Sequence, residues 1–365
     1  MSIALLGMGT AIPQYRLEQG RAAGMAVECL GLDETAARSV EVLYRRTQAK
    51  TRGSVLIRPE SGGCGMHWFY PTAPASPPGT AERMLRYRAE APPLAESACR
   101  KALSTAATTI PGLSARDITH LIVVSCTGFF APGMDYELIQ RLQLAPTVQR
   151  FSIGFMGCHG GFNGLQLATA LVMAQPEARV LLCCTELCSL HFQYSPDPGQ
   201  ITANALFADG AGAVVVGRPA TETGWSWQQS GSCLIPDSHD DMSWHIGDHG
   251  FEMFLSSRVP GLIRQTLADW LLAWLARQGK KPSDIAHWAV HPGGPRILSA
   301  VADALNLSET DLAASRQVLR EHGNMSSATV WFILEALREK KAEGLCLLLG
   351  FGPGLVAEAA LLNLS

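Results

Sequence analysis

Apolar residues occur along the chain in two kinds of run, short continuous runs and longer runs with helical spacing. MSIALLGMGTAIP at residues 1–13 belongs to the first kind and is expected to form a first strand. VPGLIRQTLADWLLAWLARQ at residues 259–278 belongs to the second kind and predicts a helix, with Pro260 and Gly261 near its start. No run approaches the roughly eighteen apolar residues of a membrane-spanning helix, so no membrane span is expected.

Three pairs of segments resemble one another at a nearly constant separation. DITHLIVVSCTG from Asp117 matches DIAHWAVHPGG from Asp284, 167 positions further on. FMGCHGGFNGLQLATAL matches EHGNMSSATVWFILEAL, and ARVLLCCTEL matches GLCLLLGFGPG, each pair 166 positions apart. Three pairs in the same order predict a duplicated α/β unit, with two similar halves packed into one body.

The boundary between the halves is expected where the apolar periodicity is interrupted, in RPATETGWSWQQSGSCLIPDSHDD at residues 218–241. This gives an N-terminal half, residues 1–220, and a C-terminal half, residues 221–365. The segment from Arg46 to Ala95 is rich in proline and glycine around YPTAPASPPGTAER. It is expected to be a long excursion outside the repeat.

Composition and charge narrow the class of protein. Hydrophobic residues make up 47% of the chain and charged residues 17%, which is ordinary for a soluble enzyme. The formal net charge of -3, with no long Lys/Arg run, argues against a nucleic-acid partner. The apolar start lacks the basic region of a signal peptide, so the ten cysteines are expected to stay reduced in the cytoplasm.

One cysteine, Cys158, lies among four glycines in FMGCHGGFNGL, where a strand is predicted to pass into a helix. The start of a helix favours a thiolate through the macrodipole and unpaired N–H groups, and thiolate is the nucleophilic form of cysteine. The glycines would allow the backbone to approach a bound acyl group and to supply an oxyanion-binding N–H.

The repeat brings two further polar residues to the same place. Asn324 is the counterpart of Cys158 in the second half, and His291 ends a strand of that half. Taken singly, each residue has an ordinary structural explanation: Cys158 as a buried thiol, Asn324 as a helix cap and His291 as a satisfied polar group. At equivalent positions of a duplicated unit, the three together predict a Cys-His-Asn catalytic site.

A metal site is the other use of clustered cysteines. CCTELC at residues 183–188 contains no C-x2-C pair, and Cys64 with His67 in GGCGMHW supplies too few ligands. We therefore predict no metal site and expect these residues to be structural or to line a pocket.

Four motifs resemble those of the type III polyketide synthases, the chalcone-synthase-like members of the thiolase superfamily. They are HPGGPRIL around His291, HGNMSSATV around Asn324, GFGPGLVAE from Gly350 and ALFADGAGAVVVG around Phe207. The resemblance covers most of the chain, is strongest after residue 120 and suits a bacterial-type member. It implies a homodimer with a thiolase-like fold in a layered αβαβα arrangement.

The resemblance also implies a chemistry for the predicted site. Cys158 would carry the starter and the growing polyketide as a thioester. His291 would act in thiolate formation and, with Asn324, would bind the thioester carbonyl of malonyl-CoA during decarboxylation. The substrates would be an acyl-CoA and malonyl-CoA, with no carrier protein and no permanently bound cofactor; a pyrone- or resorcinol-type product is compatible with this.

By the same resemblance, Phe207 is an aromatic gate beside the triad. Met253 replaces a second gating phenylalanine, Trp244 replaces a small glycine, and Ala131 replaces a methionine that reaches across the dimer. These departures argue against chalcone or stilbene as the product. The other expected pocket residues are Cys126, Thr127, Cys188, His191, Ser326, Gly352 and Pro353.

The resemblance implies a tunnel through which CoA substrates reach the site. Basic residues near its mouth are candidates to bind the phosphates of CoA. The preferred set is Arg46, Lys50 and Arg296, and Arg45 and Arg52 lie in the same basic stretch, YRRTQAKTR.

Three other functions remain open at this point. An initiating β-ketoacyl-carrier-protein synthase uses the same three residue types for a single condensation, although its motifs differ from HPGGPRIL and GFGPG. A papain-like hydrolase is disfavoured because Cys158 lies mid-chain within a repeat. A non-catalytic thiolase-like scaffold is disfavoured because all three polar residues are present.

Overall fold

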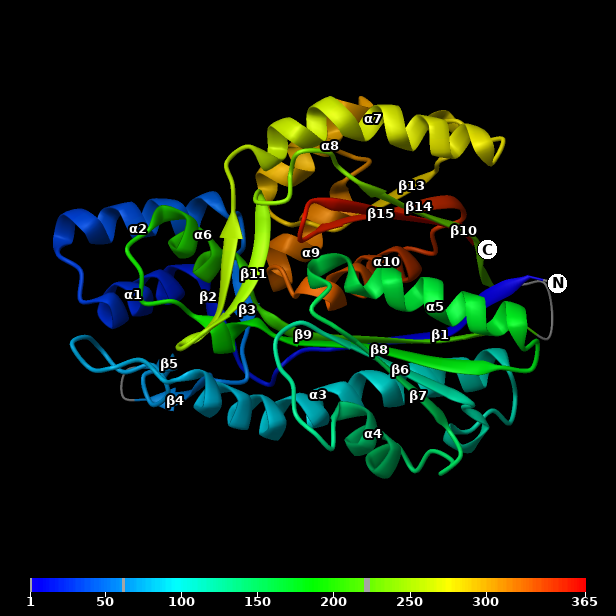
Figure 1. The fold of residues 1–365 in the computed structure, drawn as a ribbon, viewed down its shortest axis with the longest axis horizontal. Helices are drawn as coiled ribbons and strands as arrows, with labels where there is room; N and C mark the ends of the chain where they lie inside the picture. Colours follow the sequence, from blue (N-terminus) through cyan, green and yellow to red (C-terminus); the bar gives the residue numbers. More distant parts are fainter. Residues whose placement is uncertain (1, 61–62, 220–223) are drawn as a thin grey trace.

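The layers of the structure alternate between helices and sheet (Figure 1). The protein is described by a computed structural model that covers residues 2–60, 63–219 and 224–365. The outer helices of the first half are α3 (Thr80–Thr109) and α4 (Met134–Leu142), and those of the second half are α7 (Val259–Arg277) and α8 (Pro295–Leu305). Helices α5 (Gly160–Ala174) and α10 (Thr329–Glu339) lie between the sheet layers.

Among the described residues, nine strands form the central sheet. Their order is β13 (His287–Val290), β14 (Gly344–Gly352), β15 (Val356–Leu364), β10 (Trp225–Leu234), β1 (Ile3–Ala11), β9 (Asp209–Gly217), β8 (Arg179–Leu187), β6 (His120–Ser125) and β7 (Gln149–Gly154). In the first half β6 is parallel to β8, while β8–β9 and β9–β1 are antiparallel. The second half repeats this pattern with β13, β14, β15 and β10.

The topology confirms the predicted duplication. Each of the three sequence pairs falls on equivalent elements: β6 with β13, the turn and helix α5 with the turn and helix α10, and β8 with β14. The two halves are joined where β1 pairs with β10, with Ile3 opposite Trp227.

The two central helices approach each other closely at their starts. Both are buried between sheet layers, so α5 and α10 contribute apolar side chains such as Leu165 and Ile333 to one core cluster. A Cβ atom at Gly161 would lie 2.7 Å from the carbonyl oxygen of Ser327, a distance that only glycine allows. The turns preceding the two helices, Gly157–His159 and Ser326–Ala328, therefore meet.

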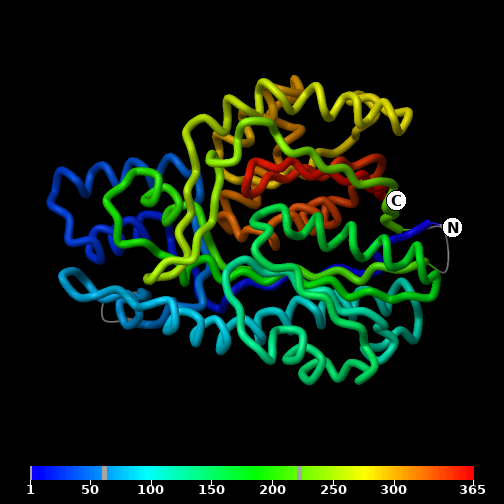
Figure 2. The backbone as a smooth tube through the Cα atoms, viewed as in Figure 1, coloured from blue at the N-terminus to red at the C-terminus, as the bar shows by residue number. Residues whose placement is uncertain are grey.

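Most of the remaining elements gather at the end of the layers away from the two termini (Figure 2). They are helices α1 (Gln19–Leu30), α2 (Glu34–Arg46) and α6 (Pro198–Leu206), and the strand pairs β2 (Arg16–Glu18) with β3 (Thr51–Gly53), β4 (Arg58–Glu60) with β5 (Gly63–Gly65), and β11 (Met242–Gly247) with β12 (Gly250–Leu255). Helix α9 (Ala313–His322) lies nearer the centre, beside α10 (Figure 1). None of the described helices is long and apolar enough to cross a membrane.

One expectation about the connecting segments is wrong. The excursion expected from Arg46 to Ala95 ends at Thr80, where α3 begins, and Pro92 and Pro93 lie inside this helix instead of breaking it. The segment 218–241, where the boundary between the halves is expected, contains β10, whose largely polar sequence forms a partly exposed strand. The boundary between residues 220 and 221 lies outside the described residues.

The close approach of β1 to α3 generates a prediction about stability. A Cβ at Gly7 would lie 2.2 Å from the backbone nitrogen of Ala106, so Gly7→Ala should force the helix away from the sheet. We expect a loss of about 2 kcal/mol or more in the free energy of unfolding, measured by urea denaturation. Gly24→Ala, inside α1 with nothing within 4 Å, is the matched control. It should stabilise by about 0.5–1 kcal/mol; equal effects would contradict the packing argument.

Candidate active site

Cys158, His291 and Asn324 line one cavity of about 400 Å³. Cys158 lies in the turn before α5, Asn324 lies just after α9, and His291 follows directly on β13. All three side chains are buried, Cys158 being 9% exposed and the others 1%. The structure therefore brings together the three residues that the repeat predicted to meet.

The side-chain amide of Asn324 is held beside the cysteine, with Oδ1 lying 4.0 Å from Sγ of Cys158. The backbone N–H of Ser326 donates to Oδ1 of Asn324 at 2.8 Å, which fixes the orientation of the amide. Nδ2 of Asn324 lies 3.9 Å from Sγ of Cys158. Beside it, the backbone of residue 324 pairs with that of residues 206 and 208, so Phe207 is fixed next to the same cavity.

The charges of the site differ from the sequence expectation. Burial raises the pKa of the Cys158 thiol to about 11, against weaker lowering by hydrogen bonds from Ser326 and Asn324. Burial also lowers the pKa of His291 to about 3. Both groups are therefore neutral, because desolvation outweighs the thiolate stabilisation expected from the helix start.

His291 has unused hydrogen-bonding capacity. Both ring nitrogens are buried, and neither has a hydrogen-bond partner among the described residues. A buried polar atom without a partner is costly, so such atoms are expected where a ligand supplies the partner. The imidazole is thus open to exchange a proton with the Cys158 thiol or to donate to a substrate carbonyl.

The glycines around Cys158 serve packing. A Cβ at Gly157, where φ is 71°, would lie 2.4 Å from Cδ of Pro353, and one at Gly352 would lie 2.1 Å from Cδ2 of His159. Gly352 does not line the cavities, whereas Pro353 lines the small space beside Cys158. The motif GFGPG thus packs tightly against the turn that carries Cys158 and fixes its position.

Phe207 and Met253 stand where three spaces meet. Both line the large cavity, a space of about 20 Å³ beside Cys158, and a side cavity of about 60 Å³. Cys126, Thr127 and Ser326 line the small space, and Cys188 lines both this space and the side cavity. Their positions fit a gate and a pocket wall.

Trp244 and His191 form a fixed wall of the pocket. The indole N–H of Trp244 donates to the carbonyl oxygen of Cys126 at 2.7 Å. His191 donates from Nε2 to the carbonyl oxygen of Thr127 at 2.7 Å and accepts the Phe251 N–H at Nδ1 at 2.9 Å, while its ring stacks on Phe251. Burial lowers the pKa of His191 to about 3, so it is a neutral structural group.

A buried carboxylate beneath the site was not predicted from the sequence. Glu186 on β8 accepts hydrogen bonds from the Cys126 backbone at 3.0 Å, from the Thr127 hydroxyl at 2.7 Å and from the Ser327 hydroxyl. Burial raises its pKa. It ties β6 of the first half to the turn before α10 of the second. The only signal in the sequence is an acidic residue at the end of the apolar run ARVLLCCTEL.

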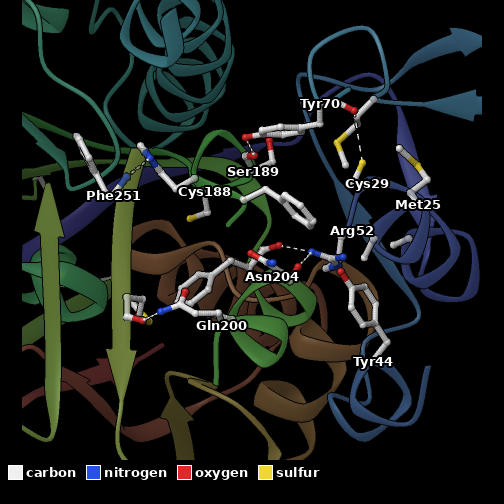
Figure 3. Close-up of a pocket in the computed structure, with 18 of the residues that line it drawn as sticks. Met25, Cys29, Tyr44, Arg52, Tyr70, Cys188, Ser189, Gln200, Asn204 and Phe251 are labelled. Atoms are coloured by element: carbon white, nitrogen blue, oxygen red, sulfur yellow. Dashed lines mark hydrogen bonds between the residues drawn. The ribbon is translucent and has the colours of Figure 1, made fainter. Parts of the chain in front are cut away.

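Figure 3 shows the side cavity and the groups that line it. Arg52 donates to the carbonyl oxygens of Asn204 and Phe207 at 2.8 and 2.6 Å, and from Nε to Gln19 at 2.9 Å. The hydrogen-bond donors of its guanidinium are therefore used by the backbone at the end of α6, by Phe207 and by Gln19. Arg52 is a structural residue, which corrects its inclusion among the CoA-binding candidates.

The other basic candidates separate by position. Arg46 and Arg296 are exposed and line the large cavity, as phosphate-binding residues at its mouth would. Lys50 and Arg45 are exposed but line none of these cavities, and the backbone N–H of Lys50 donates to Arg320. Of the three preferred CoA-binding candidates, Arg46 and Arg296 lie at the large cavity and Lys50 does not.

No group of histidine, cysteine and acidic residues able to hold a metal ion occurs in the part of the chain that the structure describes. Cys183, Cys184 and Cys188 are buried, the first two within β8. Cys64 lies half-buried on β5.

The layered αβαβα fold and the buried cavity at the meeting of its two halves define a thiolase-like enzyme. Two family models match the chain: the chalcone and stilbene synthases' N-terminal domain over residues 2–220 and their C-terminal domain over residues 227–364. The chain belongs to this family and is a type III polyketide synthase, whose substrates are an acyl-CoA and malonyl-CoA.

Individual relatives agree with this assignment. A 1,3,6,8-tetrahydroxynaphthalene synthase from Streptomyces peucetius is 38% identical over 74% of this chain and 72% of its own. An alpha-pyrone synthesis polyketide synthase-like protein, Pks18, from Mycobacterium tuberculosis is 30% identical over 98% and 90%. The solved structure of PKS-I from the brown alga Ectocarpus siliculosus superposes with a TM-score of 0.90 at 30% identity, covering 100% of this chain and 98% of that one.

The position of Trp244 generates a prediction about product size. Its indole lines both the small space beside Cys158 and an outer groove of about 560 Å³. Trp244→Gly should therefore admit longer polyketides or bulkier starters, while malonyl-CoA decarboxylation stays near wild type. Product mass measures the effect.

The matched control is Trp68→Gly. Trp68 also donates one hydrogen bond to a backbone carbonyl, that of Leu56 at 2.7 Å, but it lines none of the cavities at the site. Its removal should leave the product profile unchanged. An unchanged profile in a folded, active Trp244→Gly variant would show that Trp244 does not shape the cavity.

Proposed function

We propose that the chain acts as an acyltransferase that loads a starter acyl group on Cys158. The observation that supports this is the convergence of Cys158, His291 and Asn324 on one cavity of about 400 Å³. In the loading step the thiol proton passes to His291 and the sulfur attacks the thioester carbonyl of the acyl-CoA. CoA leaves as a thiolate and takes up the proton from His291.

Extension uses the same cavity for malonyl-CoA. The malonyl carboxylate leaves as carbon dioxide, and its bonding electrons form the enolate of the CoA thioester. His291 and Nδ2 of Asn324 donate hydrogen bonds to the enolate oxygen. The enolate carbon then attacks the acyl group on Cys158, the carbon–sulfur bond breaks, and the β-ketoacyl-CoA product can reload the cysteine.

The low polarity of the cavity supports these steps. Both ring nitrogens of His291 are without partners among the described residues, so the substrate oxygen meets donors that are not already engaged. Hydrogen bonds in such a desolvated site stabilise developing charge more strongly than they do in water. Arg46 and Arg296, at the same cavity, are proposed to bind the phosphates of CoA.

The sites are proposed to operate in a homodimer. Strand β7 is an edge of the central sheet, and the exposed side chains of Phe129 and Met156 belong to its neighbouring loops. Unpaired edges and exposed apolar side chains favour association with a second copy. Sedimentation at micromolar concentration should give twice the chain mass of 39.1 kDa. A monomer under these conditions would contradict the proposal.

We infer that the enzyme works in the cytoplasm. Its proposed substrates are CoA thioesters, and none of the cysteines in the described part of the chain lies in a disulfide. Free thiols persist in a reducing compartment.

The role of Asn324 gives the sharpest test of the mechanism. Asn324→Ala should reduce malonyl-CoA decarboxylation by about 100-fold or more, because one oxyanion donor is lost. Acyl loading of Cys158 should persist in part, since the thiol and imidazole remain. Carbon dioxide release measures decarboxylation, and the mass of the intact protein measures acyl loading. Both assays are run with no carrier protein present.

Asn324→Asp is the matched control for shape. A carboxylate of the same size accepts hydrogen bonds but does not donate them, so this variant should decarboxylate as poorly as Asn324→Ala. Full decarboxylation by either variant would remove Asn324 from the site. A requirement for a carrier protein would instead favour the single-condensation synthase.

A further inference from the structure

A second thiol, outside the catalytic cavity, has a base within reach. Sγ of Cys29 lies 3.9 Å from Nδ1 of His67, and Nε2 of His67 lies 2.8 Å from a carboxylate oxygen of Glu28. Glu28 and Cys29 are the last but two and last but one residues of α1, and His67 lies in the loop after β5. The order thiol, imidazole, carboxylate is that of an activated nucleophile.

The hydrogen bonds fix the roles of the two ring nitrogens. A carboxylate only accepts, so Nε2 of His67 donates to Glu28, and in the neutral imidazole Nδ1 presents its lone pair to the thiol. In the resting structure the thiol also has the carbonyl oxygen of Tyr70 as an acceptor at 3.4 Å (Figure 3). Since the two partners of His67 lie at opposite ring nitrogens, they do not converge on one point as metal ligands would.

The surroundings of Cys29 limit what can reach it. Cys29 is 3% exposed and lines the side cavity of about 60 Å³, together with Met25, Tyr70 and Phe207. A water molecule needs about 10–15 Å³ by this measure, so the space admits only a few groups of that size. An acyl-CoA is too large, whereas a small uncharged electrophile such as hydrogen peroxide fits. His67 and Glu28 are partly exposed and connect the thiol to solvent for proton exchange.

We propose that Cys29 is a site of oxidation by hydrogen peroxide, activated by His67 and Glu28. The thiol proton moves to Nδ1 of His67, and the sulfur attacks one peroxide oxygen. A sulfur–oxygen bond forms, the oxygen–oxygen bond breaks, and the leaving hydroxide takes the proton from His67 as water. Cys29 becomes a sulfenic acid through a two-electron oxidation, and peroxide is reduced.

The consequence lies in the side cavity. A sulfenic acid adds a polar oxygen to a wall that is otherwise formed largely by apolar side chains, next to the space behind Phe207 and Met253. The modification therefore changes the volume and polarity of the space beside the gate. This inference rests on a thiol outside the catalytic cavity, so its failure would leave the proposed function untouched.

The test follows the loss of each thiol in the full-length chain. A Cys158→Ser background prevents the catalytic thiol from consuming oxidant. After a limited dose of hydrogen peroxide, the surviving thiols are alkylated in denaturant and mapped by mass spectrometry, so burial does not limit detection. Cys29 should be lost about tenfold faster than Cys233, a half-buried thiol whose contact is the carbonyl oxygen of Leu234 at 3.7 Å.

Variants of His67 and Glu28 show whether these residues activate the Cys29 thiol or whether peroxide merely has access to it. His67→Gln should slow the oxidation of Cys29 about tenfold, less than a well-aligned base contributes because the distance of 3.9 Å is long. Glu28→Gln should slow it about twofold to threefold, because an exposed carboxylate orients the imidazole weakly. His239→Gln, which removes an exposed histidine paired with Asp240, is the matched control and should have no effect.

Oxidation of Cys29 no faster than that of Cys233 would overturn the proposal. An unchanged rate in both folded variants, His67→Gln and Glu28→Gln, would also overturn it, because the thiol would then react through access alone.

Discussion

The contact between the starts of the two central helices is the constraint on which the site depends. Gly161 of α5 lies against the carbonyl oxygen of Ser327, and Glu186 accepts a hydrogen bond from the Ser327 hydroxyl. Because these contacts join the two halves, they set the distance between the turn of Cys158 and the turn that follows Asn324. Each half supplies only part of the catalytic set, Cys158 from the first and His291 with Asn324 from the second. The catalytic cavity therefore forms only at the junction of the two halves.

Burial is the second determinant of the chemistry. The same packing that brings Cys158 and His291 together removes water from both, and desolvation raises the pKa of the thiol and lowers that of the imidazole. A neutral pair can transfer a proton internally when substrate arrives, without holding a separated charge before that step. The unengaged nitrogens of His291 are consistent with a site whose hydrogen bonds are completed by the substrate.

The sequence was sufficient to predict the duplicated fold and the meeting of Cys158 with Asn324, because an internal repeat imposes equivalent positions on its halves. It did not predict β10, since a polar strand paired on both sides carries little apolar periodicity. It also did not predict the start of α3, because Pro92 and Pro93 are tolerated within a helix packed on the sheet.

Individual roles in the site depended on contacts that sequence patterns do not encode. Glu186 has no distinguishing pattern, since a single acidic residue at the end of an apolar strand is not expected to be buried and fully hydrogen-bonded. In sequence Arg52 resembles the other basic residues of its stretch, and only its hydrogen bonds to the carbonyl oxygens of Phe207 and Asn204 distinguish it. The packing role of the glycines around Cys158, which accommodate Pro353 and Ser327, depends on contacts between the halves that the local sequence does not encode.

The central claim is that one cysteine at the junction of the halves carries every acyl intermediate. The most direct test exposes the chain briefly to an acyl-CoA and then to malonyl-CoA, and locates the bound acyl groups by peptide mass spectrometry. The account predicts thioesters on Cys158 alone, first of the starter and then of chains longer by successive two-carbon ketide units. Extended chains on another residue, or their formation in a folded Cys158→Ala variant, would contradict it.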